Sequence, residues 1–232
     1  MNIDEFKNEV EKLGIIVTEE EINKLERYCE LLKEWNEKIN LTTITDKKQV
    51  FLKHFYDSLT IVKMIDLNKV DSLCDLGTGA GFPGIVLKIF FPNLNLTLVD
   101  ALNKRINFLE IVINELYLKN VTLIHDRAEE YGKNNRECFD VITARALSSF
   151  PILLEYGIPL LKVNGHLIAM RGLNDSNDGI NALKTLDSKI INVLEFELPF
   201  EKSQRTLIDV IKLGKTSMKY PRRYAEIKKK SL

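Results

Sequence analysis

Apolar residues recur at helical spacing over the first third of the chain. In residues 3–13 they fall three or four positions apart, which is the spacing of one helix face. A second amphipathic helix is expected from Thr18, because Thr18 and Glu21 form a capping-box pattern. A third, mostly apolar helix is predicted over residues 48–65. We therefore expect residues 1–70 to form an N-terminal helical cap.

Beyond residue 70 short apolar runs alternate with helix-compatible stretches. The runs cover residues 72–76, 94–100, 121–125, 139–144, 165–170, 190–198 and 205–213. Strand–helix alternation predicts βαβ units and a parallel sheet. The last two runs are close enough for an antiparallel hairpin. We predict a Rossmann-like α/β fold over residues 71–232, with a mostly parallel seven-stranded sheet, an antiparallel edge strand and a basic tail, in one compact unit with the cap.

Composition limits the class of protein but does not identify a function. The chain has 232 residues, of which 45% are hydrophobic, and this suits one soluble α/β domain with a helical appendage. The run of apolar residues that a membrane span requires is missing from the sequence. The N-terminus is acidic and unlike a signal peptide, so we expect a cytoplasmic protein. Cys29, Cys74 and Cys138 are scattered, and we expect neither a disulfide nor a metal site.

Charge is distributed unevenly along a chain of zero formal net charge. Residues 212–232 carry eight Lys and Arg side chains against one acid, Glu226. A basic segment on a neutral chain is compatible with a phosphate-bearing partner such as RNA. On charge alone, a solvated tail is the explanation that we favour.

A glycine-rich turn follows the first predicted strand. Gly79-x-Gly81-x-x-Gly84 fits the dinucleotide pattern, which is weak on its own. Asp75, two residues before Gly77, changes the prediction, because a carboxylate disfavours a pyrophosphate and favours a cationic ligand. Asp75, Gly77, Gly79 and Gly81 are therefore predicted to bind S-adenosylmethionine, with an NAD-dependent oxidoreductase as the remote alternative.

Two further positions fit an adenosine ligand. Asp100 ends the second predicted strand, where an acid can accept hydrogen bonds from ribose hydroxyls. Capping of the following helix would explain it as well. Residues 125–130 follow the third strand, where the adenine is expected to lie. The acids there would equally suit the start of a helix.

Arg145 stands where the fourth predicted strand ends, at the edge of the sheet where a substrate is expected. The Asn/Asp-Pro-Pro-aromatic run of amino-group methyltransferases and the Pro-Cys nucleophile of C5-pyrimidine methylation are both missing from this segment. The pattern suits an acceptor that already has a lone pair, such as guanine N7, with catalysis by alignment rather than by a general base. Arginine also reads the N7/O6 edge of guanine. A salt bridge with a nearby acid is the structural alternative.

Together these motifs resemble the family of bacterial 16S ribosomal RNA guanine-N7 methyltransferases, also called glucose-inhibited division protein B (RsmG or GidB). The similarity runs nearly end to end. The segments that carry it are Asn40-Leu41-Thr42, His54-x-x-Asp57-Ser58-Leu59, residues 75–85, Lys104-Arg105-x-x-Phe108-Leu109, Arg127-Ala128-Glu129, Arg145-Ala146 and Tyr220-Pro221-Arg222.

The resemblance implies a class I S-adenosylmethionine methyltransferase fold and methylation of a decoding-region guanine at N7. It implies cofactor contacts at Gly77, Phe82, Ala128, Glu129 and Arg145, with Arg145 as the positioning residue for catalysis.

Residues expected on the RNA side come partly from the resemblance and partly from charge. The resemblance implies that Asn40, His54 and Asp57 lie near the substrate, with helix capping as the alternative for each. The family pattern adds Arg171, which keeps the positive charge of the usual lysine, and the charge of the tail adds Arg222 and Arg223.

The sequence departs from the family pattern in two places. Arg171-Gly172 replaces the usual Lys-Gly, and residues 225–227 replace the usual Thr-Pro before the terminal lysines. The partner is expected to be 16S RNA or the small ribosomal subunit or its assembly particle, and the enzyme a monomer. A methyltransferase acting on another RNA or a small molecule, and a non-catalytic ribosome-assembly protein, are the alternatives.

Overall fold

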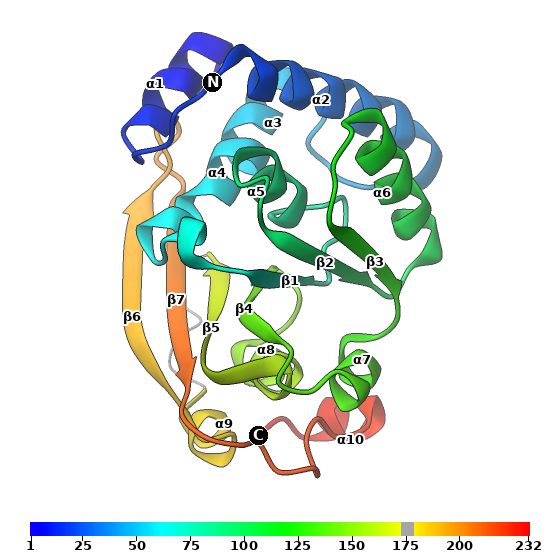
Figure 1. Ribbon diagram of the computed structural model, residues 1–232, viewed down its shortest axis with the longest axis vertical. Coiled ribbons are helices and arrows are strands. Elements are labelled where there is room, and N and C mark those ends of the chain that lie inside the picture. The colour runs from blue at the N-terminus through cyan, green and yellow to red at the C-terminus, as the bar shows by residue number, and fades with distance from the viewer. Residues whose placement is uncertain (173–178) are drawn as a thin grey trace.

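The computed structural model describes residues 1–172 and 179–232, which form a seven-stranded sheet with helices on both faces (Figure 1). The strands are β1 (Ser72–Leu76), β2 (Asn95–Asp100), β3 (Val121–His125), β4 (Phe139–Arg145), β5 (Leu161–Arg171), β6 (Ser188–Glu197) and β7 (Gln204–Lys212). The helices are α1 (Ile3–Glu11), α2 (Glu19–Ile39), α3 (Lys47–Val50), α4 (Asp57–Leu59), α5 (Gly84–Phe90), α6 (Asn103–Glu115), α7 (Ala128–Asn134), α8 (Phe150–Gly157), α9 (Ile180–Thr185) and α10 (Tyr224–Lys229). Shorter 3₁₀ turns cover Thr60–Lys63, Leu67–Lys69 and Ile158–Leu160.

The strand order β3-β2-β1-β4-β5-β7-β6 confirms the predicted mostly parallel sheet. Strands β1 to β5 pair in parallel, and β7 pairs antiparallel with both β5 and β6. The predicted hairpin is therefore present at one edge, with the reversed strand β7 inserted between β5 and the outermost strand β6. Because β7 runs the other way, its first residues lie at the carboxyl ends of the parallel strands.

The N-terminal helices cover one face of the sheet together with α5 and α6 (Figure 1). Capping boxes formed by Asn2 with Glu5 and by Thr18 with Glu21 start α1 and α2. One hydrophobic cluster joins Tyr28 of α2 to residues of the sheet, so these helices share a core with the strands.

The helix predicted over residues 48–65 is a single helical run that changes its pitch. It passes from α3 into a π-helical turn, Phe51–Tyr56, then into α4 and a 3₁₀ turn. A π-helical turn contains one extra residue per turn and is common at functional sites.

Helices α7 to α10 cover the other face of the sheet (Figure 1). The basic end of the chain is docked there, because Ile227 of α10 is 1% exposed and belongs to the hydrophobic cluster of that face. Among the described residues, no helix has the length and the apolar character that a bilayer crossing would need.

Candidate functional site

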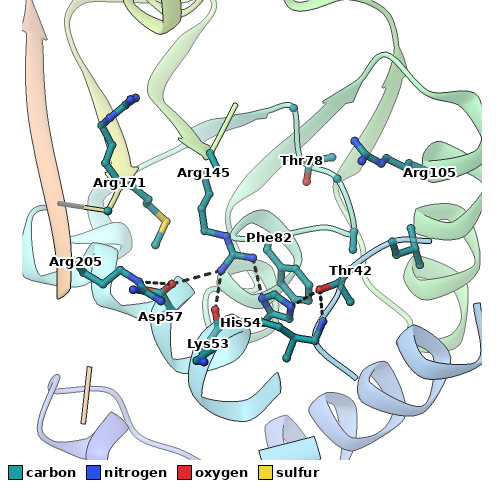
Figure 2. Close-up of a pocket in the computed structure, with 18 of the residues that line it drawn as sticks. Thr42, Lys53, His54, Asp57, Thr78, Phe82, Arg105, Arg145, Arg171 and Arg205 are labelled. Atoms are coloured by element: carbon teal, nitrogen blue, oxygen red, sulfur yellow. Dashed lines mark hydrogen bonds and ion pairs between the residues drawn. The ribbon is translucent and has the colours of Figure 1, made fainter. Parts of the chain in front are cut away.

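A cavity of about 670 Å³ opens at the carboxyl ends of β1, β4 and β5 (Figure 2). This is where open α/β sheets bind ligands. The glycine turn forms one wall, residues 41–44 and the π-helical turn form the second, and Arg145, Arg171 and Arg205 lie along the third.

The three glycines of the turn have positive φ angles, from +63° to +98°, which residues other than glycine rarely adopt. A Cβ on Gly79 would meet only the Gly77 carbonyl oxygen, at 4.0 Å, so this position leaves the cavity open. A Cβ on Gly81 would lie 2.5 Å from the Tyr28 hydroxyl oxygen. Gly79 thus makes room for a ligand, whereas Gly81 makes room for the packing of α2.

Tyr28 is a site residue that the sequence does not predict. Its hydroxyl donates a hydrogen bond to the Ala80 carbonyl, and its ring stacks on Phe82 with centroids 5.3 Å apart. The hydroxyl is buried, so an N-terminal helix holds the glycine turn in place. A tyrosine in an amphipathic stripe gives no sequence signal for such a contact.

Asp75 does not face the cavity, and the expectation that it meets a cationic ligand needs correction. Its side chain is fully buried, and its Oδ2 accepts hydrogen bonds from the Thr78 hydroxyl, at 2.7 Å, and the Gly84 amide, at 2.9 Å. Burial raises the pKa of Asp75 to about 7 despite these donors. The carboxyl group instead closes the glycine turn from behind.

Asp100 supports the turn from the neighbouring strand. Its Oδ2 accepts from the Gly79 amide at 2.9 Å and pairs with Arg105 at 3.2 Å, while its Oδ1 accepts from the Leu102 amide at 2.9 Å. Asp100 therefore holds the amide of Leu102, the residue before α6, and fixes Gly79 at the same time. A contact with ribose stays a prediction.

Ala128 and Glu129 begin α7 and do not line the cavity. Glu129 is 3% exposed, and its Oε1 lies 3.6 Å from Arg127 without a hydrogen-bond partner among the described residues. Their predicted role against the adenine stays a prediction.

Arg145 ends β4 as predicted, and its guanidinium is turned toward the N-terminal segment (Figure 2). It donates to the Lys53 carbonyl at 3.0 Å and to His54 Nδ1 at 3.1 Å, and it lies 3.6 Å from Asp57. Arg205, a residue that the sequence analysis missed, donates to the same Asp57 oxygen at 3.0 Å. The only clue to Arg205 was its position at the start of a reversed strand.

The π-helical turn explains why the Lys53 carbonyl can accept from Arg145. In an α-helix this carbonyl would accept from the Asp57 amide four residues later. Here that amide donates to the carbonyls of Leu52 and His54 instead. The irregular turn therefore exposes one backbone acceptor to the site.

His54 and Asp57, implied near the substrate, are brought together with Arg145. His54 stacks on Phe82 with ring centroids 4.4 Å apart and planes 15° apart. Burial, helped by the charge of Arg145, lowers the pKa of His54 to about 3, so the imidazole is neutral at physiological pH. Burial raises the pKa of Asp57, and the two arginines oppose that rise.

Of the next two candidates for RNA contact, one lines the cavity and one does not. Arg171 lines the cavity and donates to the Ser148 carbonyl at 3.1 Å. Asn40 does not line it, and its left-handed φ of 49° ends α2, which fits the capping alternative.

Arg222 requires a correction. Its side chain pairs with the fully buried Glu155 through contacts of 2.8 and 2.6 Å, on the face covered by α7 to α10. It is therefore a structural anchor and is not positioned to contact phosphates. Its neighbour Arg223 is exposed at the start of α10 and stays a candidate for RNA contact.

Comparison with known sequences gives matches over nearly the whole chain. The GidB family model, described as rRNA small subunit methyltransferase G, matches residues 21–208. "Ribosomal RNA small subunit methyltransferase G" of Bacillus subtilis is 45% identical over 96% of this chain and 95% of its own length. The protein of the same name from Exiguobacterium sibiricum is 44% identical over 96% of both chains.

Solved structures similar to this one support the fold alone. A SAM-dependent methyltransferase from Aquifex aeolicus superposes with a TM-score of 0.51 at 19% identity, over 72% of this chain and 94% of that one. TYW2 from M. jannaschii, crystallised with AdoMet, gives a TM-score of 0.51 at 13% identity, over 62% of this chain and 69% of that one.

Proposed function

The chain belongs to the rRNA small subunit methyltransferase G family, and from this premise we propose that it transfers a methyl group from S-adenosylmethionine to N7 of a guanine in 16S ribosomal RNA. The observation that carries the N7 assignment is the state of the two titratable acceptors in the cavity. His54 Nδ1 accepts from Arg145, and Asp57 is held by Arg145 and Arg205. His54 Nδ1 is therefore occupied, and Asp57 is 3% exposed, with both arginines on its Oδ2 and its Oδ1 buried without a partner among the described residues. Neither group offers an exposed base, and guanine N7 attacks through a lone pair that needs no deprotonation.

The residues of the glycine turn fit S-adenosylmethionine. Gly79 leaves open space in the cavity wall, and the turn is fixed by Asp75, Asp100 and Tyr28. Gly77, Gly79 and Phe82 would contact the methionine end of the cofactor, and Asp100 would accept from its ribose. When bound, this group supplies an electrophilic methyl carried on a sulfonium.

The arginine wall of the cavity suits an RNA substrate. Arg171 and Arg205 line it on the β5–β7 side and place positive charge where a phosphodiester chain would approach. The N7/O6 edge of guanine offers two acceptors to such donors. Arg145 keeps its place through the contacts to His54, Lys53 and Asp57, so its contribution to catalysis would be alignment and electrostatics.

The proposal is tested by incubating the protein with methyl-labelled S-adenosylmethionine and 16S RNA that lacks the modification, both as free RNA and as small subunits. Mass mapping of nuclease fragments should place one methyl group at N7 of one guanine. Gly79→Arg places a side chain in the open space beside the glycine turn. This variant is the negative control and should lose the activity. Methylation at any other base atom, or thermal stabilisation by NAD and not by S-adenosylhomocysteine, would overturn the proposal.

A further inference from the structure

Arg145, His54 and Thr42 form a chain of hydrogen bonds. The Arg145 guanidinium can only donate, and this fixes which atom donates and which accepts along the chain. An arginine has no acceptor atom, so His54 Nδ1, 3.1 Å from the guanidinium, must accept. In a neutral imidazole the other nitrogen then carries the hydrogen. His54 Nε2 lies 3.0 Å from Thr42 Oγ1 and therefore donates to it.

Thr42 Oγ1 accepts a second hydrogen bond, from the Ile44 amide at 3.1 Å. A hydroxyl has two lone pairs and one hydrogen. Both lone pairs are occupied by Ile44 and His54, so the hydrogen remains, and within the described parts of the chain nothing accepts it. Thr42 lines the cavity.

The position of Thr42 indicates which part of a ligand it would meet. Figure 2 shows Thr42 and Arg145 on opposite sides of His54, with Arg205 beyond Arg145 and Thr78 of the glycine turn on the Thr42 side. The hydroxyl therefore lies on the wall formed by residues 41–44 and the π-helical turn, on the side of His54 that faces away from Arg145 and the arginine wall.

We propose that the Thr42 hydroxyl donates a hydrogen bond to the carboxylate of the methionine end of the methyl donor. This inference rests on the proposed function. Because both lone pairs of this hydroxyl are occupied, it can bond only to a ligand atom that accepts. The ammonium group of the methyl donor only donates, whereas its carboxylate only accepts and forms the stronger, charge-assisted bond.

His54 is the positioning residue in this arrangement. It is held between the Arg145 guanidinium and Thr42, and its ring lies flat on Phe82 of the glycine turn. Through His54, the same arginine that ends β4 sets the direction of the Thr42 hydrogen. The arrangement would couple Arg145, which lies beside the target guanine, to Thr42, which lies beside the methyl donor.

The test uses two ligands that differ at the methionine end. S-adenosylhomocysteine has the carboxylate, and 5′-methylthioadenosine lacks the whole amino-acid end. Calorimetric titration of Thr42→Val should show about tenfold weaker binding of S-adenosylhomocysteine, as expected for a lost hydrogen bond to a charged group, and unchanged binding of 5′-methylthioadenosine. Thr42→Ser, which keeps the hydroxyl, should bind both ligands within about twofold of the wild type.

His54→Phe keeps an aromatic ring against Phe82 and removes the donor to Thr42. In that background Thr42→Val should cause a smaller additional loss of S-adenosylhomocysteine affinity than in the wild type, because the two residues act together.

Equal loss of both ligands, or no loss of either, in Thr42→Val would overturn the inference. Unchanged S-adenosylhomocysteine binding with a raised KM for RNA would overturn it in favour of a contact to the guanine. A wild-type protein that binds no S-adenosylhomocysteine would instead refute the proposed function itself.

Discussion

The two ends of the chain have opposite charge and pack on opposite faces of the sheet (Figure 1). The first 40 residues carry 11 acidic and 6 basic side chains, and this acidic end is followed by a segment that lines the cavity through His54 and Asp57. The basic end, residues 212–232, is docked on the other face of the sheet, where Arg222 pairs with Glu155. The charge of a segment therefore predicts poorly whether it meets the ligand, and the partners of its buried polar groups are the better guide.

The largest effect that tests this contrast is expected at Arg222. Arg222→Ala leaves the Glu155 carboxylate buried without its cation and should lower the free energy of unfolding by about 3 kcal/mol, measured by urea denaturation. The double variant Glu155→Met with Arg222→Met removes both charges and should regain most of that stability. A loss below about 1 kcal/mol, typical of an exposed pair, would show that Arg222 is not an anchor.

A smaller effect is expected at the N-terminal side, through His54. The folded pKa of about 3 lies below the ordinary value of 6.5, so protons bind the unfolded chain first and His54 contributes stability that is complete above pH 6.5 and is lost as the pH falls toward 3. At pH 5 the loss should reach about 2 kcal/mol, since each pH unit below 6.5 is worth about 1.4 kcal/mol.

His54→Phe is the control for this pH dependence. Denaturation curves at pH 7 and pH 5 should show the stability difference between wild type and variant changing by that amount. The change isolates His54, because the other groups that titrate in this range, including His166 with its raised pKa beside Asp209, are kept in both proteins. A pH-independent difference would mean that His54 binds protons equally in the folded and unfolded states, so that its pKa is not lowered by folding.

The smallest effect is expected at Arg223, the exposed neighbour of Arg222. If the docked tail borders the RNA, Arg223→Gln should weaken RNA binding a few-fold and reduce the slope of log affinity against log salt by about 1. Stability should stay within about 0.5 kcal/mol of the wild type. An unchanged salt slope would mean that Arg223 does not contact RNA phosphates.

The sequence predicted most of the fold, because strand–helix alternation and capping boxes act locally. The seven strands, the hairpin and the start of α2 were predicted from such patterns, and α1 was predicted from the spacing of its apolar residues. The glycine turn and the position of Arg145 at the end of β4 were likewise predicted from the sequence.

The parts of the site that escaped prediction depend on tertiary contacts. Tyr28 and Arg205 come from elements far apart in sequence, and Asp75 and Arg222 were assigned to ligands when each has a protein partner. A charged residue in isolation does not reveal whether its partner lies within the chain.

The extra residue in the turn Phe51–Tyr56 determines where the chain can accept an insertion or a deletion. Surface loops usually tolerate insertions and deletions. Removing one residue here would restore a regular helix, rotate everything after it by about 100°, and return the Lys53 carbonyl to the helix ladder. Asp57 would then face away from Arg145. Insertions and deletions should therefore be tolerated better at exposed loops than in this buried turn, whose residue count sets the shape of the cavity wall.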